Sequence, residues 1–424
     1  MLRPENFDGA ADRMVEIYSR LENFILRDTA RRVLNAGKLT ATADRLIYKL
    51  EQMGESRQEI QKKLSELTGL SEKELRKLLQ DAVLTSWKDD AEVMSQIGIE
   101  ISSPLENKAY MRIIDAEYRK SLGELSNLTR TTMDAAQRDL ISLLDDAEMR
   151  VSSGVQSYNA AAADVLDAYA GRGIMVTYPS GTRRTLEAAV RCCVVTSMNQ
   201  TAAQLTNQYI VEGGIEYILT SAHIGARTRQ PGQPALAGHD SWQGLVYKIR
   251  GSEPDAPNLL ESTGYDIDPQ TGNGTVVNPL GLHGYNCRHS HQPWDKRLRN
   301  PWRDEKGNLI DGTGNEITDA ENQERYKNSQ KQRAMERAIR KTKRQLIVKQ
   351  EQINASSGEY RDALQAEYDA EAYRLQQQNK AYNDFCAKHD LQPQYERNKL
   401  AGFGATQTKA ANKGARRYQN AKGK

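Results

Sequence analysis

Hydrophobic residues near the start of the chain recur at helical spacing. Met14, Ile17 and Leu21 lie three or four residues apart and therefore share one face of a helix predicted over residues 10–35. The same spacing of leucines predicts helix over residues 115–150. Between these segments, two Ser-x-x-Glu patterns predict helix starts, because both side chains can cap free amide groups of a first turn. The patterns are Ser56 with Glu59 and Ser71 with Glu74.

The pattern changes after residue 170. A short apolar and polar alternation over residues 171–181 ends in a Pro- and Gly-containing turn and predicts a β-hairpin. Residues 186–211 are rich in small apolar side chains and predict a buried helix. Residues 217–221 and 245–249 predict strands. The segments around them are rich in Gly, Pro, Asn and Asp and predict loops.

Charged helices dominate the C-terminal part. Residues 320–390 predict long helices with a break near residues 356–358, and the final residues lose helical periodicity. The predicted fold class is therefore mainly α, with a small α+β central module and long helical arms on both sides. The predicted ranges are a helical N-terminal arm (1–170), an α+β His/Cys/Trp module (171–300), a turn-rich linker (301–319), long charged helices (320–392) and a basic, flexible tail (393–424).

Composition limits the size of the core. Hydrophobic residues make up 38% of the 424 residues, and the mean hydropathy is −0.74. We therefore expect long, partly solvated helices that depend on one another or on a partner. No stretch approaches the ~20 apolar residues of a membrane span, and no signal peptide is recognisable. Four scattered cysteines indicate a reducing compartment rather than a disulfide framework.

One window of the chain holds most of its candidate chemistry. Cys287 lies two residues before His289, so in an extended segment the two side chains point to the same face. With histidines of a preceding loop they form a candidate tetrahedral zinc site made of His223, His239, Cys287 and His289. The spacing matches no standard zinc pattern, and the sequence favours a hydrogen-bonded structural cluster without a cofactor, with zinc as the alternative.

A nucleophilic site is a further alternative. Cys287 would pair with a histidine and with Asp240 or Asp266. No oxyanion-hole element, Walker-type loop or dinucleotide-binding glycine motif accompanies these residues. Nearby arginines would bind phosphate or carboxylate, or else tie the loops together. These arginines are Arg227, Arg229 and Arg288.

Positive charge is concentrated near the C-terminus, although the net charge is only +3. Residues 325–349 hold ten Lys or Arg against one acid, and residues 409–424 hold six and no acid. Such an excess indicates contact with DNA or an acidic partner, whereas a solvated helix face is the alternative. Without a helix-turn-helix or zinc-finger pattern, any DNA contact would be independent of sequence. The candidate nucleic-acid-binding residues are Lys331, Arg333, Arg337, Arg340, Lys341 and Arg344.

Three motifs follow one another around the histidine window. They are Ser221-Ala-His-Ile-Gly-Ala-Arg227, His239-Asp-Ser-Trp-Gln-Gly-Leu-Val-Tyr247 and Gly281-Leu-His-Gly-Tyr-Asn-Cys-Arg-His-Ser290. In this order they resemble the tailed-phage minor capsid protein 2 family, which is distantly similar to the Mu F-like head-morphogenesis proteins. The flanking segments 178–191 and 332–341 fit the same family. The loop 230–238 is longer than the family pattern.

This resemblance implies a structural, non-enzymatic protein of a tailed-bacteriophage virion, present in few copies inside the capsid or at the portal vertex. It implies a role in head assembly or in DNA packaging and ejection, with assembly in the host cytoplasm. The implied partners are the portal protein, other head or scaffold proteins, and packaged DNA; a membrane and a small-molecule substrate are not expected. A virion-borne hydrolase or transferase that uses the His/Cys/Arg module is the alternative.

Overall fold

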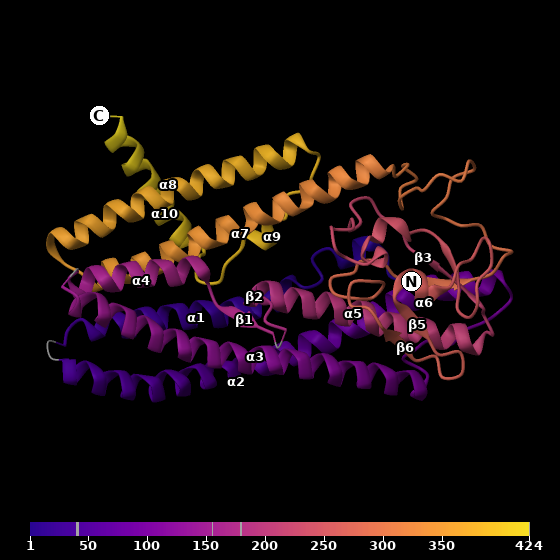
Figure 1. Cartoon of the computed structure of the whole chain (residues 1–424), viewed down its shortest axis with the longest axis horizontal. Helices are drawn as coiled ribbons and strands as arrows, with labels where there is room; N and C mark the ends of the chain where they lie inside the picture. The colour runs from indigo at the N-terminus through magenta and orange to yellow at the C-terminus, as the bar shows by residue number, and fades with distance from the viewer. Residues whose placement is uncertain (40–41, 155, 179, 424) are drawn as a thin grey trace. The chain divides into compact units, whose positions relative to one another are not determined.

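The computed structural model describes residues 1–39, 42–154, 156–178 and 180–423 (Figure 1). The chain is 65% helical and has small antiparallel sheets between residues 175 and 294, which confirms the predicted fold class. The helices are α1 (Asp12–Ala36), α2 (Thr42–Gln96), α3 (Lys108–Ser152), α4 (Tyr158–Arg172), α5 (Leu186–Glu212), α6 (Leu259–Thr263), α7 (Asp319–Ala355), α8 (Gly358–Lys388), α9 (Tyr395–Asn398) and α10 (Ala405–Lys422). The strands are β1 (Met175–Thr177), β2 (Arg183–Thr185), β3 (Tyr217–Thr220), β4 (Val246–Lys248), β5 (Tyr265–Ile267), β6 (Gly274–Val276) and β7 (His291–Trp294). None of the described helices is long and apolar enough to cross a lipid bilayer.

The chain divides into two compact units, each assembled from separated stretches. Unit 1 comprises Met1–Ala11, Glu72–Leu125 and Arg191–Gln330. Unit 2 comprises Asp12–Ser71, Ser126–Val190 and Lys331–Lys424. The five contiguous domain ranges expected from the sequence, from the N-terminal arm to the C-terminal tail, stay a prediction.

Several predicted elements are confirmed at nearly their predicted bounds. Helices α1 and α5, the strands β3 and β4, and the break between α7 and α8 all lie where the hydrophobic pattern placed them. The predicted hairpin is present as β1 paired with β2, with Met175 opposite Thr185. Pro179, in the predicted turn, lies outside the described residues.

Helix α2 runs without a break from Thr42 to Gln96, so the two helix starts predicted at Ser56 and Ser71 are wrong. Both serines lie within the length of this helix, and both are buried. The Ser71 hydroxyl donates to the Thr68 carbonyl at 2.9 Å, and the Ser56 hydroxyl donates to the Asp28 carboxylate at 3.0 Å. A serine within a helix can satisfy its hydroxyl in this way, so the Ser-x-x-Glu pattern alone does not identify a first turn.

The C-terminal segment differs from the sequence expectation of a flexible tail. Helix α10 packs on α8, and both are orange to yellow in Figure 1. Its buried face consists of small residues, Ala411, Gly414 and Ala415. An added Cβ at Gly414 would lie 2.8 Å from the Asp369 carboxylate, so the two helices approach closely there. Small side chains add little to a hydrophobic pattern, which is why the sequence did not reveal this helix.

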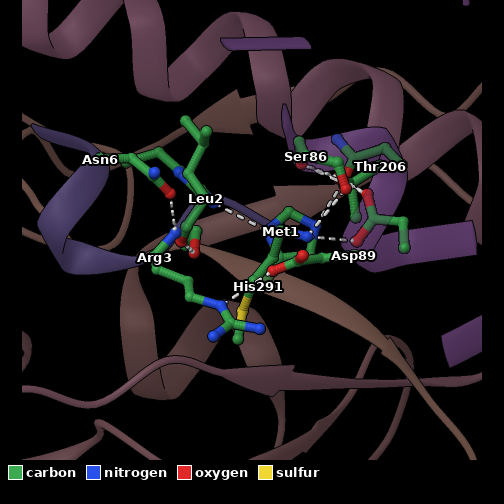
Figure 2. A network of polar contacts seen from close by, with 12 residues as sticks. Met1, Leu2, Arg3, Asn6, Ser86, Asp89, Thr206 and His291 are labelled. Atoms are coloured by element: carbon green, nitrogen blue, oxygen red, sulfur yellow. Dashed lines mark hydrogen bonds and ion pairs between the residues drawn. The ribbon is translucent and has the colours of Figure 1, made fainter. Parts of the chain in front are cut away.

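The first residues of the chain belong to unit 1 and are held by buried polar contacts (Figure 2). The amino group of Met1 donates to the Ser86 carbonyl and to the Asp90 carboxylate, each at 2.9 Å. The Leu2 carbonyl accepts a hydrogen bond from the Ser290 hydroxyl. Because a buried charge is costly unless it is paired, the Asp90 carboxylate of α2 stabilises the amino group, while the Ser290 contact places Leu2 beside the start of β7.

Candidate functional site

A three-stranded sheet in unit 1 brings two histidine-bearing loops together. Its strand order is β4-β3-β7, and both pairs are antiparallel. Thr220 at the end of β3 lies opposite His291 at the start of β7. Beyond them, the Ser221 amide donates to the Ser290 carbonyl at 2.9 Å, and the Ser290 amide donates to the Ser221 hydroxyl at 3.0 Å. The first and third sequence motifs are therefore neighbours in space.

Three of the four predicted zinc ligands converge, and we call His239, Cys287 and His289 the trio. Nδ1 of His239 lies 3.3 Å from Nδ1 of His289. The Cys287 sulfur lies 3.8 Å from the first nitrogen and 4.0 Å from the second. All three side chains are at most 2% exposed. This is a compact set of nitrogen and sulfur atoms of the kind that divalent zinc prefers.

The opposite ring nitrogens of the trio have oxygen partners. Nε2 of His239 lies 2.8 Å from the Leu280 carbonyl, and Nε2 of His289 lies 3.1 Å from the Gln243 side-chain oxygen. Burial lowers the pKa of His239 to about 3 and the pKa of His289 well below its ordinary value. Burial also raises the pKa of the Cys287 thiol to about 11. Desolvation penalises charge, so the two rings are neutral.

His223, the fourth predicted ligand, is not one of the three converging residues. Its ring stacks on His289, with centroids 4.5 Å apart and planes 25° from parallel. Its Nδ1 faces the Ile224 carbonyl at 3.1 Å, and burial lowers its pKa to about 4. The ring thus covers one face of His289.

The remaining two histidines of the window form a separate group, which we call the histidine pair. His283 and His291 are both buried, and Nε2 of His283 lies 2.8 Å from Nδ1 of His291. Nδ1 of His283 lies 2.9 Å from the Asn199 side-chain oxygen, and Nε2 of His291 lies 2.9 Å from the Asn207 side-chain oxygen. Burial holds the pKa of both rings far below the ordinary value.

Sequence reasoning missed the two asparagines of α5. Asn199 and Asn207 are fully buried. The Asn199 amide also donates to the carbonyls of Cys287 and His289, at 3.1 and 2.9 Å. Polar residues within an otherwise apolar helix were the available signal, because buried amides need partners and are seldom placed in a core without a reason.

Among the described residues, neither Asp240 nor Asp266 is hydrogen-bonded to a trio histidine, so the nucleophilic alternative lacks its carboxylate. Both trio histidines direct Nε2 at an amide or carbonyl oxygen, and Asp266 is paired with Arg250 at 2.6 Å. A thiol with a pKa of about 11 is also a weak nucleophile near neutral pH.

The three arginines near this core bind other parts of unit 1. Arg227 donates to the carbonyls of Leu280 and Tyr285, and Arg229 donates to the Gln233 carbonyl. Arg288 pairs with Asp8 at 3.0 Å. These contacts tie loops together, as one of the two sequence interpretations expected.

The six candidate nucleic-acid-binding residues of α7, all in unit 2, differ in exposure. Lys331, Arg337 and Lys341 are exposed, and Arg333 is half-buried. The other two are buried. Arg340 pairs with Glu187, and Arg344 donates to the Ala170 carbonyl at 2.9 Å and faces Glu22 at 3.8 Å. These two arginines neutralise acids within the fold and are not part of a positive surface.

The fold and this core define a mainly helical protein with a small α+β module that encloses buried histidines. A model of the family described as phage minor capsid protein 2 matches residues 2–387. The chain therefore belongs to the phage minor capsid protein 2 family, which confirms the resemblance of the motifs. No match to the chain is found among curated proteins or among solved structures.

Proposed function

We propose that this chain is a low-copy structural protein of the phage head, placed at the portal vertex, which contacts packaged DNA without sequence specificity during head assembly, packaging or ejection. Membership of a phage capsid family supports the place in the virion. The DNA contact is supported by the surface charge of unit 2, and above all by the charged face of α10.

Helix α10 has two different faces. One carries the small buried residues that pack on α8, and the other carries Lys409, Lys413 and Arg416, which are exposed. These cations are spaced by four and three residues, so they share one side of the helix. The helix contains no Asp or Glu. A positive ridge of this kind suits the phosphate backbone of DNA, which is recognised by charge.

Helix α7 adds exposed cations to the same unit. Lys331, Arg337 and Lys341 are exposed and stay candidates for phosphate contact. Arg340 and Arg344 are omitted from the proposed surface because they are buried in ion pairs and carbonyl contacts. The proposed DNA-binding set is thus smaller than the one the sequence suggested.

The proposed role is non-enzymatic. The trio is buried, and its histidines face an amide and a carbonyl oxygen rather than a carboxylate. Such an arrangement favours cohesion of the module over acyl or phosphoryl transfer.

The test is salt-dependent DNA binding of the full chain. Wild type should bind duplex DNA of unrelated sequences equally, with affinity that falls steeply as salt rises. The triple variant Lys409→Gln, Lys413→Gln, Arg416→Gln should bind more weakly, and the slope of log affinity against log salt should fall by about 2–3. Fluorescence anisotropy over a salt series measures both quantities.

A matched control removes the same charge elsewhere. Lys73, Lys77 and Lys88 are exposed on α2, where acidic residues are interspersed. Their triple replacement by Gln should leave DNA affinity nearly unchanged. An equal loss of DNA affinity in both triple variants would show that only net charge matters. It would contradict a specific DNA-binding face on α10. Binding that survives high salt would contradict the electrostatic contact itself.

The proposed place in the virion has its own test. Co-expression with the portal protein should yield a complex that survives size-exclusion chromatography. Recovery with the major capsid protein but never with the portal would contradict the portal assignment.

A further inference from the structure

The distances within the trio match the spacing of ligands around one metal ion. With Zn–N of about 2.05 Å and Zn–S of about 2.3 Å, tetrahedral geometry separates two nitrogens by about 3.3 Å and nitrogen from sulfur by about 3.5 Å. The two Nδ1 atoms of the trio are 3.3 Å apart, and the sulfur lies 3.8 and 4.0 Å from them. A shift of the sulfur by a few tenths of an ångström, within the reach of a side-chain rotation, completes the arrangement.

The hydrogen bonds of the His239 and His289 rings determine which ring nitrogen carries the hydrogen and which keeps a lone pair for a ligand bond. A carbonyl oxygen only accepts, so Nε2 of His239, which faces the Leu280 carbonyl, carries its ring hydrogen. The side-chain oxygen of Gln243 accepts from the backbone amide of His223 at 3.0 Å, which fixes the direction of that side chain. Nε2 of His289 faces the same oxygen and therefore also carries its hydrogen.

A neutral ring with hydrogen on Nε2 has its lone pair on Nδ1. The two Nδ1 lone pairs of the trio consequently face each other in a buried site, with no hydrogen between them. The thiol hydrogen of Cys287 can serve only one of them. Without a further occupant, one buried acceptor lacks a donor, which is costly in a protein core. A cation between the three atoms removes this conflict.

We propose that His239, Cys287 and His289 bind one zinc ion through Nδ1, Sγ and Nδ1. On binding, the Cys287 S–H bond breaks, the sulfur keeps the electron pair as a thiolate ligand, and the proton leaves to solvent. No electron transfer is needed. The trio fills three of the four tetrahedral positions, and the fourth is left to a ligand from outside the trio. This site does not rest on the proposed DNA contact.

The surroundings of the trio are those of a metal site. Metal-binding histidines usually donate their second ring hydrogen to an oxygen, which fixes the ring direction, and the Leu280 carbonyl and the Gln243 oxygen accept here. The Asn199 amide, which donates to the carbonyls of Cys287 and His289, holds the backbone of two ligands.

Burial indicates what the ion does. The trio is at most 2% exposed, so a substrate does not reach it in this conformation. The ligands come from two loops that are far apart in sequence, η3 at His239–Ser241 and the segment before β7. Zinc therefore cross-links these loops and stabilises the α+β module, as structural zinc does in small domains with little apolar core.

The experiment measures metal content of the full chain, purified under reducing conditions with a tag that contains neither histidine nor cysteine. After one equivalent of zinc and desalting, wild type should retain about one zinc per chain by elemental mass spectrometry. Cys287→Ser should retain at least about tenfold less. Cys193→Ser is the matched control, because Cys193 is buried in the same unit and lies outside the trio. It should retain as much zinc as wild type.

A second measurement keeps the proposal testable if Cys287→Ser does not fold. Apo wild type titrated with Co²⁺ should develop the strong visible absorption of a tetrahedral site and a near-ultraviolet thiolate-to-metal band, saturating at one equivalent. Wild type that retains no zinc and shows no such bands would overturn the proposal. Equal zinc content in Cys287→Ser and Cys193→Ser would overturn the assignment of Cys287 as a ligand.

Discussion

Two groups of histidines lie in the same module and are equally buried, yet only one of the two groups includes a thiol. In the histidine pair, every ring nitrogen has a polar partner at 2.8 to 2.9 Å, and the chain of contacts ends at Asn199 and Asn207. In the trio, the outer nitrogens likewise face oxygens, and the inner nitrogens lie 3.3 Å apart. In both groups the oxygen partners place the ring hydrogens on the outer nitrogens, but only in the trio does a thiol sulfur lie within 4.0 Å of both inner nitrogens.

This difference shows that burial and residue type alone do not define a metal site. Five histidines of one window are all held neutral by desolvation. What separates the trio from the pair is the Cys287 sulfur. The pair offers two ring nitrogens, whereas the trio offers two ring nitrogens and a thiol around one point. Substitutions can test each side of this contrast.

The largest effect on stability is expected in the histidine pair. His283→Asn should keep the contact with Asn199 but leave Nδ1 of His291 without its partner, and Asn tolerates the positive φ of 57° at this position. The lost partner and the residual cavity should lower the free energy of unfolding by about 2–4 kcal/mol. Urea unfolding followed by circular dichroism measures the change, and elemental analysis should find zinc unaltered. Loss of zinc with little loss of stability would instead indicate that the histidine pair, and not the trio, binds the metal.

A smaller effect is expected from the oxygen partner of His289. Gln243→Leu removes the acceptor that directs this ring, so the affinity for zinc should fall by about 10–100-fold. Competition with a chromophoric chelator measures the affinity. The wild-type Gln243 oxygen also binds the His223 amide, so unfolding is measured in parallel to separate stability from binding. An unchanged affinity would contradict the proposed orientation of His289.

The smallest effect is expected at His223. His223→Phe keeps an aromatic ring stacked on His289 but removes both nitrogens. Zinc content should stay the same, and unfolding should change by about 0.5 kcal/mol or less, since the side chain is only partly buried. If zinc is lost in this variant, His223 is a fourth ligand, as the sequence alone suggested, and the trio is incomplete.

The amino-acid pattern predicted much of the fold. Apolar spacing identified α1, α5 and the break between α7 and α8, because the spacing of apolar residues within a helix can be read from a short stretch of sequence. The clustering of histidines and Cys287 located the chemically distinctive module, and the ordered motifs identified the family. Local pattern failed at Ser56 and Ser71, where a capping signal lies inside one helix.

What the sequence determined by itself is therefore the class of fold, the position of the module and the family. Only the tertiary structure decided which buried polar groups meet. It excluded Arg340 and Arg344 from the positive surface, brought Asn199 to the histidine core and separated His223 from the trio. These outcomes depend on contacts between residues far apart in the chain. A side chain's partner, and hence its protonation and its free lone pairs, is fixed by packing that no local pattern of residues records.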